Sequence, residues 1–130
     1  MTQRSKTYEN GLATRKKVLG EEHVNRSMQN VTEFTEPLQD FLVEHAWGAV
    51  WTRDGLSLQE RSMINLAMLT ALNRPHELKL HIKGAINNGL TQEQMREIFL
   101  QTAVYCGAPA AIDAFRTAQE VFKDLEAGAA

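Results

Sequence analysis

The chain has 130 residues, enough for one hydrophobic core but not two. Its 14 basic and 16 acidic residues give a formal net charge of −2, which provides no electrostatic footprint for nucleic acid or for an anionic membrane. The single cysteine, Cys106, excludes an internal disulfide and a Cys-x-x-Cys redox pair.

We expect one domain over residues 1–130, with residues 1–6 as a loose arm and 126–130 as a tail. The first ten residues are polar and lack an apolar signal segment. No apolar run reaches the roughly 18–20 residues that span a bilayer. A cytoplasmic protein is therefore expected.

Helix-compatible segments, separated by glycine and proline, fill the first half of the chain. Gly20 is a typical helix stop, and Pro37 is tolerated in a first helical turn. The predicted helices cover about residues 7–19, 21–29 and 35–50, followed by a loop at 51–55.

Two capping boxes begin helices in the second half, one at Ser57 with Glu60 and one at Thr91 with Gln94. The helix that starts at Ser57 is apolar on nearly every side to about Leu72, so we expect it to be the central buried helix. Further helices are predicted over 75–88, 91–106 and at least 112–122. Nothing alternates with period two, so we predict an all-α bundle of about six or seven helices with no sheet.

Glu77 and His81 lie four residues apart and share one face of their predicted helix. A carboxylate beside an imidazole can fix its tautomer and raise its pKa, which suits a general acid near neutral pH. The alternative is a surface pair that stabilises the helix by about 0.2–0.5 kcal/mol. A metal site is less favoured, because catalytic zinc usually takes three protein ligands and His23, His45 and His76 lack motif spacing.

Aromatic and basic side chains form a second group. Trp47 and Trp51 are one helical turn apart, with Arg53 just beyond, so they can wall an apolar pocket beside a carboxylate-binding guanidinium. Arg61 lies in an otherwise apolar helix and needs an anionic partner, either an internal glutamate or a substrate carboxylate. The alternative is that both tryptophans are core or subunit-interface residues.

Two residues near the end of a predicted helix have ambiguous roles. Tyr105 can donate a hydrogen bond into a pocket, although a buried tyrosine satisfied by the backbone is the commoner case. Cys106 has no basic neighbour in sequence, so we expect a small packed hydrophobic side chain.

In this order, these features resemble the gamma-carboxymuconolactone decarboxylase family over about residues 8–122. The matching segments are Arg15–Gly20, Trp47–Arg53, Arg61, Glu77–His81, Asn88–Thr91 and Ala103–Pro109. The Glu-Leu-x-x-His segment and the tryptophan segment are specific when they occur together.

The resemblance implies an alkylhydroperoxidase-D-like helical fold and a homo-oligomer, commonly a hexamer. It also implies a cofactor-free step in protocatechuate breakdown, in which 4-carboxymuconolactone loses carbon dioxide to give 3-oxoadipate enol-lactone. Peroxidase members of the superfamily carry a Cys-x-x-Cys followed by histidine. Here Glu77 and His81 occupy that region, so thiol-pair peroxide reduction is chemically unavailable.

The reaction's demands suggest a role for each residue. We expect His81 to donate the proton, Glu77 to orient it, and Arg53 and Arg61 to hold carboxylates. Trp47 and Trp51 would form an apolar wall, and Tyr105 is a weaker choice for stabilising the oxyanion. The expected ligand is a small dicarboxylate lactone, with no metal, nucleic acid or membrane partner.

Two other functions stay open on sequence grounds. One is an enzyme of the same fold that acts on another small lactone or unsaturated acid, since pocket specificity depends on a few side chains. The other is a non-enzymatic helical oligomer, in which the Glu–His pair and the tryptophans join subunits.

Overall fold

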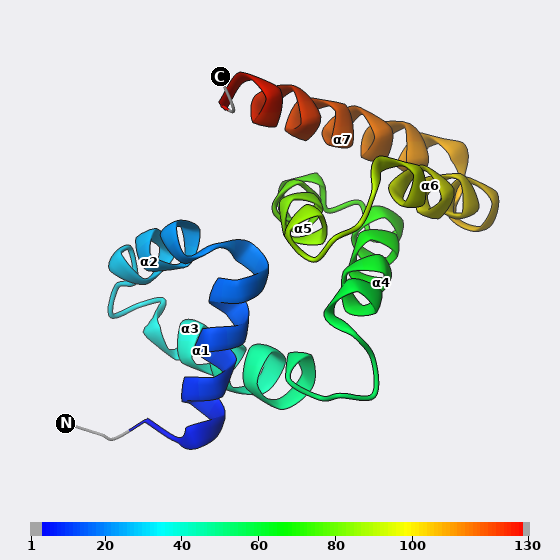
Figure 1. Ribbon diagram of the computed structural model, residues 1–130. Coiled ribbons are helices and arrows are strands. Elements are labelled where there is room, and N and C mark those ends of the chain that lie inside the picture. The colour runs from blue at the N-terminus through cyan, green and yellow to red at the C-terminus, as the bar shows by residue number, and fades with distance from the viewer. Residues whose placement is uncertain (1–3, 129–130) are drawn as a thin grey trace. The chain divides into compact units, whose positions relative to one another are not determined.

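The computed structural model describes residues 4–128, and these residues are helical with short connections (Figure 1). The α-helices are α1 (Lys6–Leu19), α2 (Glu21–Gln29), α3 (Glu36–Phe41), α4 (Leu58–Ala71), α5 (Pro75–Asn87), α6 (Gln92–Cys106) and α7 (Ala108–Gly128), and a π-helical segment, η1, covers Leu42–Trp51. No strand occurs in this part of the chain, so the all-α prediction is confirmed. None of the helices described is long and apolar enough to cross a membrane.

The chain divides into two compact units, residues 1–58 and 59–130. Unit 1 contains α1, α2, α3 and η1, and unit 2 contains α4 to α7. The tryptophan segment therefore belongs to unit 1, whereas the Glu77–His81 segment belongs to unit 2.

Local sequence signals place several helix ends. The hydroxyl of Ser5 accepts the backbone N–H of Tyr8 and caps α1, and Gly20, at φ 95°, ends that helix. Thr91 and Gln94 form the predicted reciprocal capping box at the start of α6. Gly107, at φ 105°, separates α6 from α7, which explains why the chain breaks there.

A close approach of two backbones holds α1 against η1 in unit 1. A Cβ added at Gly11 would overlap the Val43 carbonyl oxygen, and one added at Gly48 would overlap the Thr7 carbonyl oxygen. The predicted helix over 35–50 is in fact α-helical only to Phe41 and then π-helical to Trp51. Apolar spacing favours a helix there but does not distinguish a regular turn from a wider one.

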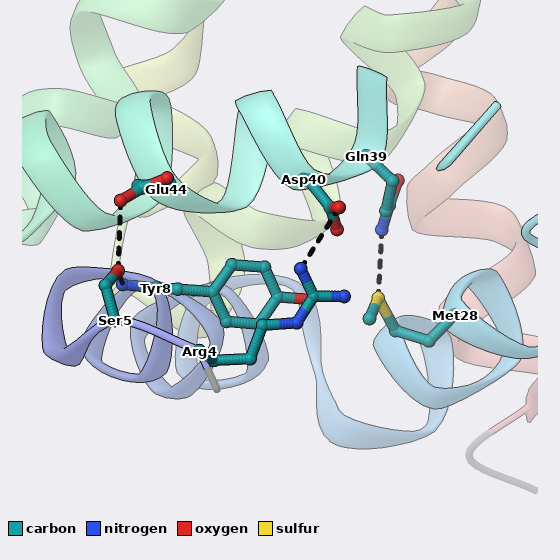
Figure 2. Close-up of polar contacts among 7 residues, drawn as sticks. All are labelled: Arg4, Ser5, Tyr8, Met28, Gln39, Asp40 and Glu44. Atoms are coloured by element: carbon teal, nitrogen blue, oxygen red, sulfur yellow. Dashed lines mark hydrogen bonds and ion pairs between the residues drawn. The ribbon is translucent and has the colours of Figure 1, made fainter. Parts of the chain in front are cut away.

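Arg4 and Ser5, which precede α1, contact α3 and η1. Figure 2 shows Arg4 directed at Asp40, with 3.0 Å between the charged atoms, and Ser5 directed at Glu44, to which its hydroxyl donates at 2.9 Å. The Arg4 guanidinium also lies 4.4 Å from the centre of the Tyr8 ring. Of the expected arm (1–6), Arg4 and Ser5 make these contacts and Lys6 begins α1. Of the expected tail (126–130), residues 126–128 belong to α7. Residues 1–3 and 129–130 lie outside the described chain.

The core of unit 2 forms where α5, α6 and α7 meet. Its buried side chains are Leu66, Leu78, Ile82, Ala85, Leu90, Met95, Phe99, Ala114, Ala118 and Val121. From α4 this core takes Leu66, and the exposed fractions of Ile64, Met68 and Leu72 are 43%, 48% and 60%. The prediction of a central, fully buried helix is wrong for the single chain, because the helices beside α4 cover only one of its apolar faces.

Candidate active site

His81 lies in the middle of α5, half-buried, with its ring against α4. The Nδ2 atom of Asn65 on α4 is 3.3 Å from His81 Nδ1. When the amide donates this hydrogen bond, Nδ1 is the acceptor and the proton of the neutral ring is on Nε2. The contact thus selects the ring nitrogen that can donate a proton to a ligand.

Burial lowers the pKa of His81, and the nearby Glu77 carboxylate opposes this with a smaller effect that raises it. Glu77 thus raises the pKa as expected, but burial has the larger effect, so the pKa of His81 is lowered overall. Glu77 is itself exposed, so solvent weakens its field, whereas the ring loses much of its own hydration. In the ligand-free chain His81 is mainly neutral near pH 7.

Arg61 and Asn65 are one turn apart on α4, and therefore share a face of that helix. The position of this face relative to α5 is also fixed by Asn88, whose amide donates to the Ser62 hydroxyl at 2.8 Å. We call Arg61, Asn65, Glu77 and His81 the His81 cluster. It combines a guanidinium, an amide, a carboxylate and an imidazole within unit 2.

Trp47 and Trp51 are the expected apolar wall, and they pack on one another in unit 1. Their ring centroids are 4.8 Å apart with an interplanar angle of 28°, and their exposed fractions are 7% and 8%. Arg53 follows η1 and is exposed. The stacking confirms that the two indoles share a face; their part in the site stays a prediction.

Tyr105 and Cys106 line a different surface from the His81 cluster. Tyr105 is 81% exposed and Cys106 is exposed, so the expectation of a packed cysteine is wrong and a backbone-satisfied buried tyrosine is not found. Both residues line an apolar hollow of about 360 Å³ between α4 and α6, together with Met63 and Ala67. At 3.6 residues per turn, Met63 and Ala67 lie on the side of α4 away from Arg61 and Asn65, so the chain by itself does not bring Tyr105 to His81.

Asn65 is the residue of this cluster that sequence reasoning missed. Its only signal is an amide within the apolar run of residues 63–69, four positions after an arginine. The structure also shows no group of three or more His, Cys, Asp or Glu side chains able to hold a metal among residues 4–128. The expectation that no cofactor or metal is needed remains a prediction.

These features define an all-helical chain with a polar cluster, including a histidine, set between two helices. Comparison with known proteins identifies its family. A sequence model of the Carboxymuconolactone decarboxylase family matches residues 36–120. The chain belongs to this family, which confirms the predicted resemblance and the all-α class expected with it.

Named relatives agree with this assignment. The chain is 45% identical to the 4-carboxymuconolactone decarboxylase of Acinetobacter baylyi over 118 residues, which cover 91% of this chain and 88% of the relative. It is 42% identical to the nitrosuccinic acid decarboxylase of Metarhizium robertsii, over 91% of this chain and 82% of that protein. Both relatives are named as decarboxylases.

Proposed function

We propose that the protein removes carbon dioxide from 4-carboxymuconolactone without a cofactor, giving 3-oxoadipate enol-lactone. The observation that carries this proposal is the 45% identity to a 4-carboxymuconolactone decarboxylase over nearly the whole chain. The His81 cluster adds a chemical reason, because it offers a proton donor and a cation on adjoining helices.

The substrate itself supplies the electron sink. When the carboxylate leaves as carbon dioxide, the electron pair of the broken C–C bond moves through the ring double bond to the carbonyl oxygen of the lactone. This forms a dienolate. A proton must then be added to the carbon next to the lactone carbonyl. Decarboxylation of this kind needs stabilisation of the developing oxyanion and one proton donor.

His81 is the proposed proton donor, acting through Nε2 because Asn65 occupies Nδ1. The resting ring is mostly neutral, since burial lowers its pKa. A bound dicarboxylate brings negative charge to the ring, which raises the pKa and favours uptake of a proton from solvent. Substrate binding thus prepares the acid, and the reaction consumes the proton that binding took up.

The remaining roles follow from charge and polarity. Arg61 would hold a substrate carboxylate next to the His81 ring, and Glu77 would orient and stabilise the imidazolium. Arg53, Trp47, Trp51 and Tyr105 are proposed, as before, for carboxylate binding, an apolar wall and oxyanion stabilisation.

The second relative suggests what the substrates share. Nitrosuccinic acid is, by its name, a dicarboxylic acid with a nitro group, and a nitro group also accepts the electron pair that decarboxylation leaves behind. We infer a common requirement for a leaving carboxylate beside an electron acceptor and for a second carboxylate that is held. Nitrosuccinate is therefore the most informative rival substrate.

Purified protein should be assayed with 4-carboxymuconolactone and, in parallel, with nitrosuccinate, following release of carbon dioxide and the identity of the product. We expect enol-lactone formation well above the spontaneous rate and slower turnover of nitrosuccinate. The reverse preference would assign a different substrate. No turnover of either would leave the non-enzymatic oligomer, in which Glu77→Ala and His81→Ala alter assembly.

We also propose a homo-oligomer, with the family's hexamer as the expected form, acting in protocatechuate catabolism in the cytoplasm. The support is family membership together with the exposed apolar side chains of Ile64 and Met68 on α4 and of Leu72 directly after it. Exposed apolar side chains of this kind are typical of a surface that a second subunit covers. Light scattering of the full chain measures the subunit number.

A further inference from the structure

We propose that unit 1 carries a pocket for a small organic carboxylate, formed by α2 and the segment that follows it and supported from behind by Arg15 of α1. This pocket lies outside the machinery proposed for the reaction, since none of those residues lines it.

Arg15 is a half-buried cation whose partners carry no charge. Its Nη2 atom donates to the Ser27 hydroxyl at 3.2 Å, and its Nη1 atom lies 3.8 Å from the sulfur of Met28. Its Nε atom is buried without a hydrogen-bond acceptor among the described residues. Burial lowers the pKa of Arg15, yet a guanidinium stays protonated, so this positive charge lacks an anion to compensate its lost hydration.

Ser27 contacts Arg15 and also lines a hollow on the surface of unit 1. Because its oxygen accepts the Arg15 N–H, the serine's own hydrogen is available to an acceptor on the other side. The hollow has a volume of about 480 Å³ and lies on α2 and α3. A ligand carboxylate in that hollow would accept a hydrogen bond from the Ser27 hydroxyl. The positive charge of the desolvated Arg15 would also attract it.

The rest of the lining suits an organic anion. The polar members include His23, Arg26 and Asn30, and no aspartate or glutamate is among the lining residues. Arg26 pairs with Glu22 at 3.7 Å, but both side chains are largely exposed, so little is lost when Arg26 turns to a ligand. Val31 and Leu38 add apolar surface for a carbon skeleton, and the volume fits a small molecule.

The test uses the full chain, labelled with nitrogen-15, and succinate as the probe. Arginine Nε–H signals are resolved from backbone signals, and the Arg15 signal is identified by its loss in Arg15→Lys. We expect saturable shifts of the Arg15 Nε–H and of the Ser27 amide with succinate, and none with uncharged succinamide. Shifts confined to Arg61 and residues around His81 would place succinate in the proposed reaction site and overturn the pocket.

Substitutions of the residues proposed to bind the carboxylate test the pocket further. Ser27→Ala and Arg15→Gln should each weaken succinate binding by about tenfold or more, because each removes part of one charge-assisted contact. Lys17→Gln removes the same charge from an exposed position on α1 and should leave the affinity within about twofold. If Arg15→Gln does not fold, the wild-type spectra and Ser27→Ala decide the matter. Equal affinity for succinate in Ser27→Ala, or equal binding of succinamide, would contradict the proposal.

Discussion

His81 depends on a neighbour from another helix as much as on the acid one turn away. Asn65 meets one ring nitrogen at 3.3 Å, while Glu77 is exposed and acts on the ring through its charge. The amide therefore governs which nitrogen carries the proton, and the carboxylate adjusts how easily a second proton binds. These two effects are separable by mutation.

Asn65→Leu should lower kcat for 4-carboxymuconolactone by about tenfold, because the ring loses the donor that fixes its tautomer. Asn65→Asp should instead move the falling, alkaline limb of the pH–rate profile to higher pH, since a carboxylate raises the pKa of the imidazole. Gln59→Leu is the control, because it removes a 3.0 Å hydrogen bond from α4 to the carbonyl of Gly89, just beyond the end of α5. An equal loss of kcat in all three variants, with no shift in either limb of their pH–rate profiles, would show that Asn65 has only a structural role.

The lowered pKa of His81 also predicts how stability varies with pH. The unfolded ring titrates near pH 6.5, and the folded ring binds its proton only at lower pH. The unfolded state therefore holds more protons in this window, so the free energy of unfolding falls as pH drops below about 6.5 and levels off below the folded pKa. His81→Gln should flatten this slope in urea titrations at several pH values, whereas His76→Gln, at an exposed position of α5, should keep it.

The sequence predicts only part of this site. The Glu77–His81 pair follows from helical spacing, which is local. The Asn65 contact joins residues 16 positions apart, and it depends on the register between two helices. The net direction of the His81 pKa shift depends on burial, which is likewise a tertiary property. The adjacent carboxylate raises the pKa as the sequence predicts, but the larger lowering by burial cannot be read from helical spacing.

At the scale of elements, the crossing of α1 and η1 depends on glycine. Gly48→Ala should destabilise the protein by about 3 kcal/mol, because the new methyl group overlaps the Thr7 backbone and neither helix can move freely. Gly55→Ala, where nothing lies within 4 Å of the added carbon, should change stability by less than about 0.5 kcal/mol. Urea unfolding of the two variants tests the crossing; similar stabilities would show that the helices separate easily.

The sequence predicts well those helix ends that depend on neighbouring residues. It does not predict which helix faces are buried. The Thr91 capping box and the Gly20 and Gly107 stops depend on residues next to them in sequence. The π-helical form of η1 and the half-covered α4 depend on what packs beside them. An apolar helix can be buried by its own chain or by another subunit, and its sequence is the same in both cases.

At the scale of the whole molecule, we predict that the two units unfold together as one domain. Both tryptophans lie in unit 1, so fluorescence follows that unit, while circular dichroism follows all helices. Phe99→Ala, in the core of unit 2, should cost about 3–5 kcal/mol and shift both transitions equally. Leu100→Ala, at the half-exposed next position, should have a much smaller effect. A fluorescence transition that stays in place while circular dichroism shows two steps would indicate two domains.

The central claim is that His81 supplies the proton that ends the decarboxylation. The most direct test is the turnover of 4-carboxymuconolactone by His81→Gln, measured beside His76→Gln as a folded control from the same helix. We predict a fall in kcat of about 100-fold or more for His81→Gln, the usual size of a general-acid contribution, with His76→Gln close to wild type. A folded His81→Gln protein that turns over the lactone within a few fold of wild type would contradict the account.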